Sequence, residues 1–589
     1  MIIVHIAENI VVWITENKMI LQWQPPPPLC ILIIKFNRNG NFVILPRPLS
    51  GVKPKESIHF PTKLPSQRME NNKKVSKAAG AVSGMTLISR IFGMARDLAI
   101  AMQFGSSVAA DAFFVAFRIP NMQRKILGEG AVSAAFIPVF TDLLNTKGEK
   151  AAWEMTANLL NIVFVILVIT TCAIFFFSPA VITVFAPGFL DDPEKFALTV
   201  KLTQWMAPYL IFIGLASFCM GILNTFNVFA LPAAAPVLLN ISMILGIFFV
   251  SPLMEEPIFG LAVGVLLGGV LQLLVQLPET FRKGFTFVKT FDVKHPEIIK
   301  IGKLMVPVMF GLAVYEINML IDTLLASLLP GGSISYLYYG NRLVQLPLGV
   351  FAVALGVAIL PMLSRQAANK DFAELKKTLA FGIRFILFIT IPATVGLIIL
   401  RFPIVNALWE RGEFLRASTD GTAIALLYYS LGLCAFAGIK VIVPAYYSLQ
   451  DTKTPVKIGI YSMLLNIVLN LILMGPLQHG GLALATSISA LLNVLLLVYF
   501  LKKRLGLIGG RLILISTLKL ALSSTLMGIQ IYYCDLTFYD PLASLGERVF
   551  VLLGCIFTGI FTFGFLSYLM KNDELIFLLS LFKNRRRKS

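Results

Sequence analysis

The stretch ANLLNIVFVILVITTCAIFFF, at positions 157–177, holds 21 residues and no charged side chain. A helix rises about 1.5 Å per residue, so a helix of this length crosses the roughly 30 Å hydrocarbon core of a bilayer. Apolar runs of this length recur from Ser76 to Met570. The sequence therefore predicts a protein built from membrane-spanning helices.

The composition indicates the same class of protein. Of the 589 residues, 57% are hydrophobic and 14% are charged, whereas an ordinary soluble domain has about 25% charged residues. A soluble chain of this length would divide into several domains with polar surfaces. We predict an all-α integral membrane protein with about fourteen transmembrane helices. The predicted spans are 78–104, 109–141, 154–186, 197–226, 232–252, 257–279, 300–329, 334–362, 379–402, 418–448, 455–475, 480–501, 512–533 and 546–570.

The connections between these spans differ in charge. The even-numbered connections are mostly basic, as in Lys502–Arg504 of the twelfth, and so is the tail after Met570. The odd-numbered connections are acidic or mixed, as in Asp191 and Asp192 of the third. Because basic loops stay in the cytoplasm, we expect both termini there. The net charge of +19 is spread over short loops, which argues against nucleic acid as a partner.

A weak internal repeat organises the spans. The segment AFIP at 135–138 resembles AILP at 358–361, an offset that also relates Pro232 to Pro455. This offset places spans one to six over spans seven to twelve, which predicts two six-helix lobes of the same orientation and two extra C-terminal helices. The predicted domains are an N-lobe at 69–281, a C-lobe at 282–505, helices thirteen and fourteen at 506–570, and a basic cytoplasmic tail at 571–589.

Residues 1–68 lie outside this pattern. Their two moderately apolar patches are separated by four prolines at 25–28, and Glu8 and Glu16 disfavour a span in the first patch. We interpret this extension in one of two ways. Either the start codon is assigned too early and the natural chain begins at Met69, or the extension is a disordered or interaction segment.

Ionisable residues cluster in the first two spans, where such groups are costly and usually face a cavity or a partner. The cluster comprises Arg90, Arg96, Asp97, Asp111, Arg118, Arg124, Lys125 and Glu129. The spacing of seven residues places Asp111, Arg118 and Lys125 on one helix face. Three additional arginines without enough nearby acids predict a basic, hydrated cavity for an anionic headgroup, since a guanidinium group can hold phosphate oxygens bidentately. For Asp97, Arg118 and Lys125, a structural role in ion pairs between helices stays open.

The second lobe contributes further charges. Arg342, at the start of the eighth span, could face the same cavity from across the lobe interface. Glu316 and Asp322 of the seventh span would repel an anion, so we expect them to serve a coupling cation or to pair with Arg342. The six cysteines and four histidines are scattered, and no span has a catalytic arrangement of His with Asp or of paired acids. These features favour a transporter over an enzyme.

Several segments resemble the MurJ/MviN family. They are MTLISRIFGMARDLAIAMQFG at 85–105, ADAFFVAFRIPNMQRKILGEGAVSAAFIPVF at 110–140, LNTFNVFALPAAAPVLLNISMI at 223–244 and QDTKTPVKI at 450–458. The resemblance runs from about Met69 to the end and is weakest after Leu505. It implies a lipid II flippase of the multidrug/oligosaccharidyl-lipid/polysaccharide exporter superfamily in the bacterial cytoplasmic (inner) membrane, with two lobes around a central cavity. Lipid II, an undecaprenyl-pyrophosphate-linked disaccharide-pentapeptide, is the implied substrate.

The resemblance also implies roles for particular residues. Family positions important for function match Arg90, Arg96, Asp111, Arg124 and Arg342. The first three arginines would hold the pyrophosphate or nearby groups, Asp111 would orient them, and Arg342 would close the site from the other lobe. The two extra helices would help to form a groove for the lipid tail.

A coupling ion, Na+ or H+, is a further expectation from the resemblance. Some members of the family have a sodium site, and the matching positions are Asp322, Asn466, Asn470 and Thr486. Oxygen ligands suit a hard cation, although an amide at Asn470 replaces a family carboxylate and lowers the negative charge. Membrane lipids and cell-wall synthesis proteins are further expected partners. The alternatives are an exporter of another polyprenyl-pyrophosphate-linked saccharide, a multidrug exporter and a membrane-embedded enzyme.

Overall fold

A computed structural model describes the backbone of residues 2–7, 10–15, 18–23, 30–36, 42–48, 64–125 and 132–586. Side chains are described over 84–125 and 135–580, apart from positions 310 and 315. The chain divides into two compact units, Met1–Ala81 and Val82–Ser589. The helix α1, Leu64–Phe104, runs through the boundary between them.

The first unit contains a five-stranded antiparallel sheet in which each strand pairs with the next along the chain. Its strands are β1 (Ile2–Ala7), β2 (Ile10–Thr15), β3 (Lys18–Trp23), β4 (Cys30–Phe36) and β5 (Phe42–Pro48). The sequence suggested no strands here, because the apolar patches were compared only with membrane spans. β-Branched residues dominate β2, and three isoleucines lie in β4, which suits a pleated strand. The segment 49–63, which belongs to the predicted extension, lies outside the described residues.

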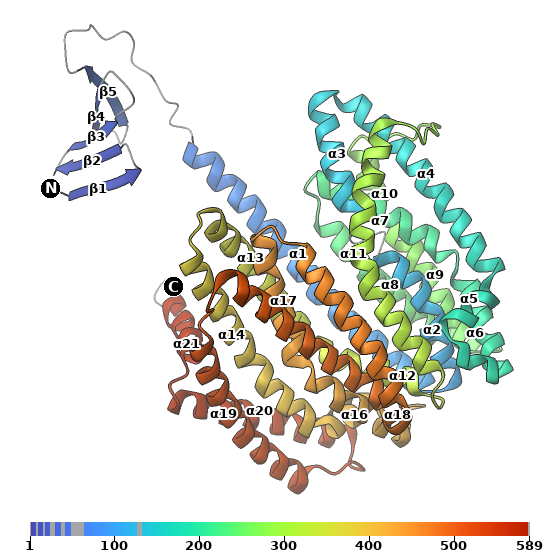
Figure 1. Ribbon diagram of the computed structural model, residues 1–589. Coiled ribbons are helices and arrows are strands. Elements are labelled where there is room, and N and C mark those ends of the chain that lie inside the picture. Colours follow the sequence, from blue (N-terminus) through green and yellow to red (C-terminus); the bar gives the residue numbers. More distant parts are fainter. Residues whose placement is uncertain are drawn as a thin grey trace. The chain divides into compact units, whose positions relative to one another are not determined.

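The second unit is helical (Figure 1). The helices before residue 290 are α1, α2 (Val108–Gln123), α3 (Val132–Thr146), α4 (Glu149–Phe176), α5 (Ser178–Phe185), η2 (Pro187–Asp191), α6 (Pro193–Met206), α7 (Tyr209–Thr225), α8 (Ala230–Leu245), η3 (Gly246–Val250), η4 (Ser251–Leu253), α9 (Ile258–Leu274) and α10 (Leu277–Arg282). Those that follow are α11 (Pro296–Ser327), α12 (Ser333–Pro347), η5 (Leu348–Ala352), α13 (Val353–Ala368), α14 (Phe372–Ile399), α15 (Arg401–Trp409), α16 (Arg416–Leu431), α17 (Leu433–Ser448), α18 (Lys453–Leu505), α19 (Gly510–Phe538), α20 (Leu545–Leu569) and α21 (Asp573–Arg586).

The predicted all-α membrane fold is confirmed for this unit. Within the described residues, nine helices are long and apolar enough to cross a membrane, or eleven if each bent pair counts as one span. Other predicted spans fall on helices outside that set: 78–104 lies on α1, and 109–141 covers α2 and α3, on either side of residues that the structure does not describe. The observed helices are therefore consistent with about fourteen spans.

Breaks within the spans follow from the local sequence. Pro208 lies where α6 turns into α7 at 40°, and Gly432 lies where α16 turns into α17 at 43°. In α18, Gln478 has a φ of 50°, just after Pro476. Proline removes a backbone donor and clashes with the preceding turn. This kink divides α18 into the two spans that the sequence predicted separately.

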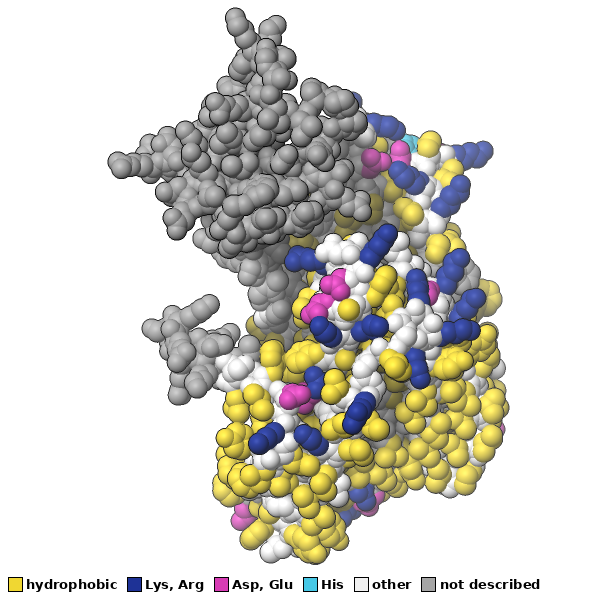
Figure 2. Space-filling model, turned by 60° about the vertical axis from the view of Figure 1, so that its left-hand side comes forward, with side chains coloured by type: hydrophobic (Ala, Val, Ile, Leu, Met, Phe, Trp, Pro, Cys, Tyr) yellow, Lys and Arg dark blue, Asp and Glu magenta, His cyan; other side chains and the backbone are white. Residues whose placement is uncertain are grey.

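Small residues let neighbouring helices approach closely, as is usual in membranes. The helices α8 and α9 pack against each other. A Cβ atom on Gly264 of α9 would lie only 2.7 Å from the carbonyl oxygen of Ser242 in α8. Where the surface faces lipid, large apolar side chains are exposed instead, as with Leu518 of α19 and Phe557 of α20. Figure 2 shows hydrophobic side chains covering much of the lower part of one face, with Lys and Arg gathered above them.

We call α2–α10 together with α1 from Val82 onward the N-lobe, and α12–α18 the C-lobe. The helix α11 packs against α3 of the N-lobe and against α18 of the C-lobe. The predicted extra helices are α19 and α20, which lie beside α14 (Figure 1). Arg384 of α14 forms ion pairs with Asp573 at 3.0 Å and with Glu574 at 3.4 Å, and these pairs anchor α21. The lobe boundary at 281/282 stays a prediction.

Candidate functional site

The centre of the candidate site is the point where α1 meets α12. Asp97 of α1 is fully buried, and its Oδ1 accepts hydrogen bonds from Nε of Arg96 at 3.0 Å and from Nη2 at 2.5 Å. Its Oδ2 lies 2.6 Å from Nε of Arg342 in α12. One carboxylate of the N-lobe is therefore shared by two guanidinium groups, one from each lobe.

Uncharged residues complete this cluster. The hydroxyl of Tyr338 in α12 donates to Oδ1 of Asp97 at 2.9 Å and accepts from Nη2 of Arg96 at 3.1 Å. Nη1 of Arg96 donates to Oδ1 of Asn240 in α8 at 3.0 Å. The amide of Asn240 in turn donates to the carbonyl of Ser89 in α1 at 3.2 Å. These bonds hold Arg96 rigidly between α1, α8 and α12.

The charges in this cluster do not balance. Arg96 and Arg342 bring two positive charges to the single negative charge of Asp97, so a net charge of +1 remains. The guanidinium of Arg90, two turns before Asp97 on α1, covers Gly349 of η5. Among the described residues, no hydrogen bond or ion pair joins the Arg90 side chain to a partner. About a third of the Arg342 side chain is exposed, so an anion can approach the excess charge.

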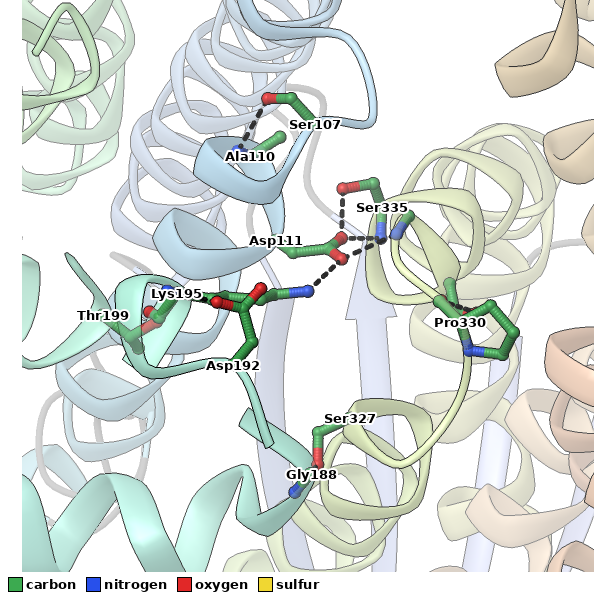
Figure 3. Close-up of polar contacts among 12 residues, drawn as sticks. Ser107, Ala110, Asp111, Gly188, Asp192, Lys195, Thr199, Ser327, Pro330 and Ser335 are labelled. Carbon is green, nitrogen blue, oxygen red and sulfur yellow. Dashed lines mark hydrogen bonds and ion pairs between the residues drawn. The ribbon is translucent and has the colours of Figure 1, made fainter. Parts of the chain in front are cut away.

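Asp111 was predicted to orient the arginines, but in this structure its carboxylate contacts other groups. Its carboxylate is buried elsewhere, between Lys195 of α6 and the start of α12 (Figure 3). Oδ2 accepts from Nζ of Lys195 at 2.9 Å and from the backbone N–H of Gly332 at 2.8 Å. Oδ1 accepts from the hydroxyl and the backbone N–H of Ser335 at 2.6 and 3.0 Å. Because the first N–H groups of a helix lack partners within it, Asp111 caps α12 from the other lobe.

Backbone segments of the two lobes also touch at this end. The N–H of Glu413 donates to the carbonyl of Met102 at 2.9 Å. Gly105 and Gly412 both have positive φ angles, and a Cβ atom on either would clash with the carbonyl group facing it. The lobes are therefore closed against each other at the α1–α2 turn.

The predicted shared face of α2 makes a row of contacts with α11. Arg118 donates to the carbonyl of Met319 and to the hydroxyl of Thr323, both on α11. Two helical turns further along α2, Nζ of Lys125 lies 3.1 Å from a carboxylate oxygen of Glu316. Lys125 thus forms an ion pair with α11, whereas Arg118 contacts neutral oxygens of that helix. Glu316 pairs with Lys125, not with Arg342 as one alternative had it.

Arg124 lies apart from the Asp97 cluster. It caps the C-terminal end of α2, and its Nε and Nη2 donate to Oδ1 of Asn121 at 3.3 and 3.2 Å. Thirteen residues separate it from Asp111, which is about 20 Å along a helix axis. In this structure Asp97 contacts Arg96 and Arg342, whereas the contacts described for Asp111 and Arg124 are made with other residues. A shared site for all five predicted residues stays a prediction.

The four residues of the predicted cation site do come together, between α11 and α18. The amide of Asn470 donates to Oδ1 of Asp322 at 2.7 Å and lies 3.1 Å from the side-chain amide of Asn466. The amide of Asn466 lies 3.4 Å from the hydroxyl of Thr486. The buried Oδ1 of Asn470 has no hydrogen-bond partner among the described residues. An unsatisfied buried oxygen beside a carboxylate and a hydroxyl fits a hard cation.

Tyr338 and Asn240 were not among the predicted site residues, because both are neutral. One signal was present for each: Tyr338 lies one helical turn before Arg342, and Asn240 falls in one of the segments on which the family resemblance rested. For Asp97 the sequence left a functional and a structural role open, because it does not give the neighbours of Asp97 in space. The structure shows that Asp97 is the acid that joins the arginines.

The turn before α18 illustrates how polar groups outside the spans are held. Asp451 accepts from the N–H of Thr454 at 3.0 Å and pairs with Nη1 of Arg504 at 3.0 Å. Partial burial raises the pKa of Asp451, but the Thr454 hydrogen bonds and the Arg504 charge together outweigh it, so the pKa lies below its ordinary value. The carboxylate stays ionised at neutral pH and ties this turn to the end of α18.

Comparison with known proteins gives one consistent family. The sequence model described as lipid II flippase MurJ matches residues 100–546. A Vibrio cholerae protein named probable lipid II flippase MurJ is 42% identical over 433 residues, which are 72% of this chain and 82% of that protein. The lipid II flippase MurJ of Burkholderia cenocepacia is 36% identical over 432 residues, 73% of this chain and 84% of that protein.

Solved structures match the fold. One described as lipid II flippase MurJ in an inward closed conformation has a TM-score of 0.72 and 31% identity, and the match covers 84% of this chain and 99% of that chain. An inward-facing multidrug resistance MATE family transporter of the MOP superfamily has a TM-score of 0.61 over 73% of this chain and 98% of its own. Its identity is 15%, so this likeness shows the fold alone.

The shared carboxylate gives a direct test of the cluster. In Asp97→Asn, the two guanidinium groups would face each other without the charge between them, and breaking such a buried pair costs about 3–5 kcal/mol. We expect the free energy of unfolding in detergent to fall by that amount. The control is Asp420→Asn, whose exposed pair with Arg416 at 3.7 Å should contribute about 1 kcal/mol or less. Equal losses in the two variants would contradict a central role for Asp97.

Proposed function

The chain belongs to the lipid II flippase MurJ family, and on that premise we propose that its arginine cluster binds the pyrophosphate of lipid II during transport. The protein is a multi-pass transporter that moves lipid II across the membrane, and it is not an enzyme. The single observation that supports the proposed site is the excess positive charge that Arg96 and Arg342 leave around Asp97.

A pyrophosphate suits this cluster for electrostatic reasons. A guanidinium group inside a membrane protein is costly unless an opposite charge lies near it. Asp97 compensates one of the two arginines that it contacts, so an anion that reaches Arg342 and Arg90 would relieve the remaining charge. Guanidinium groups stay ionised and bind phosphate oxygens with two parallel hydrogen bonds. Tyr338 and Asn240 would hold Arg96 in place while Arg342 adjusts.

The transport cycle follows from the contacts between the lobes. With both termini in the cytoplasm, as the basic connections predict, the α1–α2 turn lies at the outer face. The closed contacts at Gly105 and Asp111 then correspond to a state shut toward the outside. We propose that these contacts break and the lobes close at the other end when the headgroup moves outward. The arginines, with the headgroup bound to them, would thus face the inner side of the membrane and then the outer side.

Two sources could drive this cycle. The membrane potential, negative inside, favours outward movement of negative charge by about 2.3 kcal/mol per charge for each 100 mV. A cation held by Asp322, Asn466, Asn470 and Thr486 would add a second source, because α11 and α18 both contribute to that site. When bound, the cation would neutralise Asp322 and satisfy Asn470. Cell-wall synthesis proteins stay predicted partners.

Another polyprenyl-pyrophosphate-linked saccharide is a less favoured substrate. It shares the pyrophosphate that the arginines would bind, but the relatives from Vibrio cholerae and Burkholderia cenocepacia carry the name of lipid II flippases. The multidrug transporter shares the fold alone.

Removing either arginine that supplies the excess positive charge should slow transport. In liposomes that contain lipid II with a fluorescent reporter, Arg90→Ala and Arg342→Ala should each slow movement between leaflets by about tenfold or more, since a charged hydrogen bond contributes about 1.5–3 kcal/mol. Lys502→Ala, an exposed position in the last turn of α18, is the control. Full transport by either arginine variant would remove that residue from the site. Equal transport of a pyrophosphate-linked lipid with an unrelated saccharide would favour the alternative substrate.

The closed outer contacts can be tested with a cross-link. The hydroxyls of Ser106 and Ser418, one in each lobe, lie 2.6 Å apart, so thiols at these positions would be within bonding reach. The double variant Ser106→Cys/Ser418→Cys should lose transport when oxidised and regain it after reduction. Each single variant should transport under both conditions. If the cross-linked protein transports lipid II as fast as the same variant does after its disulfide is reduced, then opening at this end is not part of the cycle.

The cation site has a readout apart from transport. Sodium should raise the midpoint of thermal unfolding of the purified protein by several degrees relative to choline at equal ionic strength, because binding to the folded state stabilises it. Asp322→Asn should abolish this increase, and Asp420→Asn should keep it. No increase in the wild-type protein would rule out sodium. An Asp322-dependent response to pH alone would assign the site to protons.

A further inference from the structure

Two glycines lie directly beneath the arginines of the candidate site. A Cβ atom on Gly93 of α1 would lie 2.7 Å from Nη2 of Arg342 and 3.6 Å from Nδ2 of Asn240. A Cβ atom on Gly349 of η5 would overlap the guanidinium of Arg90, because the Nη1, Cζ and Nη2 atoms of that group are its nearest neighbours. Each arginine therefore occupies the space that a side chain at the glycine would need.

The arrangement is reciprocal between the lobes. Arg90 and Gly93 lie one helical turn apart on α1, and Arg342 and Gly349 lie two turns apart along α12 and η5. Each arginine reaches from its own lobe to the glycine of the other. Both contacts can exist only while α1 and the α12–η5 segment are close together.

Backbone conformation does not explain these glycines. Neither Gly93 nor Gly349 is among the glycines with positive φ, such as Gly105 and Gly412. Both lie inside helical segments, where glycine is a weaker helix former than alanine. What they provide is the absence of a side chain, which lets a guanidinium group approach the backbone.

We propose that Gly93 and Gly349 are positioning residues that set where the guanidinium groups of Arg342 and Arg90 lie. This inference rests on the proposed function, because it assumes that these groups bind the pyrophosphate. A methyl group at Gly93 would displace Arg342 from its 2.6 Å contact with Asp97, and a methyl group at Gly349 would displace Arg90. Because each glycine belongs to the opposite lobe, lobe movement also moves each arginine relative to its support. Arginine placement is therefore coupled to the transport state.

The first test compares glycines on similar helices. Gly93→Ala and Gly349→Ala should each reduce lipid II transport at least fivefold at equal amounts of folded protein. Gly84→Ala in α1 and Gly311→Ala in α11 are matched controls, since a Cβ atom at either position meets nothing within 4 Å. Transport by Gly93→Ala or Gly349→Ala at the level of the controls would overturn the proposal for that glycine. If neither the wild-type protein nor the two control variants transport lipid II, the result would instead contradict the proposed function.

Double variants separate a positioning role from general damage to the fold. Lysine is narrower and lacks the planar head, so Gly93→Ala should cost little extra in an Arg342→Lys background. The same substitution should keep its full fivefold effect in an Arg90→Lys background. Gly349→Ala should instead cost little extra in the Arg90→Lys background and keep its full effect in the Arg342→Lys background. Equal effects in both backgrounds would overturn the proposal.

A variant that fails to fold still decides the question. If Gly93→Ala is not recovered in the membrane, then Gly93→Ala/Arg342→Lys should be recovered, because the clash with Arg342 is removed. Failure of both proteins would place the clash elsewhere and overturn the assignment. The same comparison applies to Gly349→Ala with Arg90→Lys.

Discussion

The rest of the site depends on one carboxylate that two arginines share across a lobe interface. Asp97 is fully buried and contacts Arg96 from its own helix and Arg342 from the other lobe. A carboxylate paired with a single arginine would have no net charge, so no excess positive charge would remain to attract an anionic ligand. With two cations and one anion, the folded protein keeps an unbalanced positive charge between its halves. Tyr338 and Asn240 hold this arrangement together without adding charge.

The same interface also has to come apart. Asp111 caps α12 from the other lobe, and Arg118 and Lys125 reach α11 along the same face of α2. These contacts are polar, so water can replace them when the lobes separate, whereas a continuous apolar interface would have to expose its surface. In the proposed cycle, the Asp111 contact with α12 and the charged contacts of α2 with α11 would break and form again as the lobes move. Binding and conformational change thus depend on neighbouring parts of one interface.

Much of the membrane fold could be predicted from the sequence. An apolar run such as 157–177 must form a helix in a bilayer, because every backbone polar group has to be paired within the segment. This requirement does not depend on what the helix packs against. The bends at Pro208 and Gly432 and the strands of the first unit were not foreseen, since short strands and bent pairs have no comparable length requirement.

For the site, the sequence by itself determined which charges had to be accounted for: the arginines at 90, 96 and 342, and the stripe on α2. It could not determine their partners, because an acid such as Asp97 or Asp111 can pair with any cation that the fold brings near. Only the tertiary structure decided that Asp97 joins the arginines while Asp111 binds Lys195 and α12. The physical reason is that helix spacing determines the face a residue occupies, whereas packing between distant helices determines what that face meets.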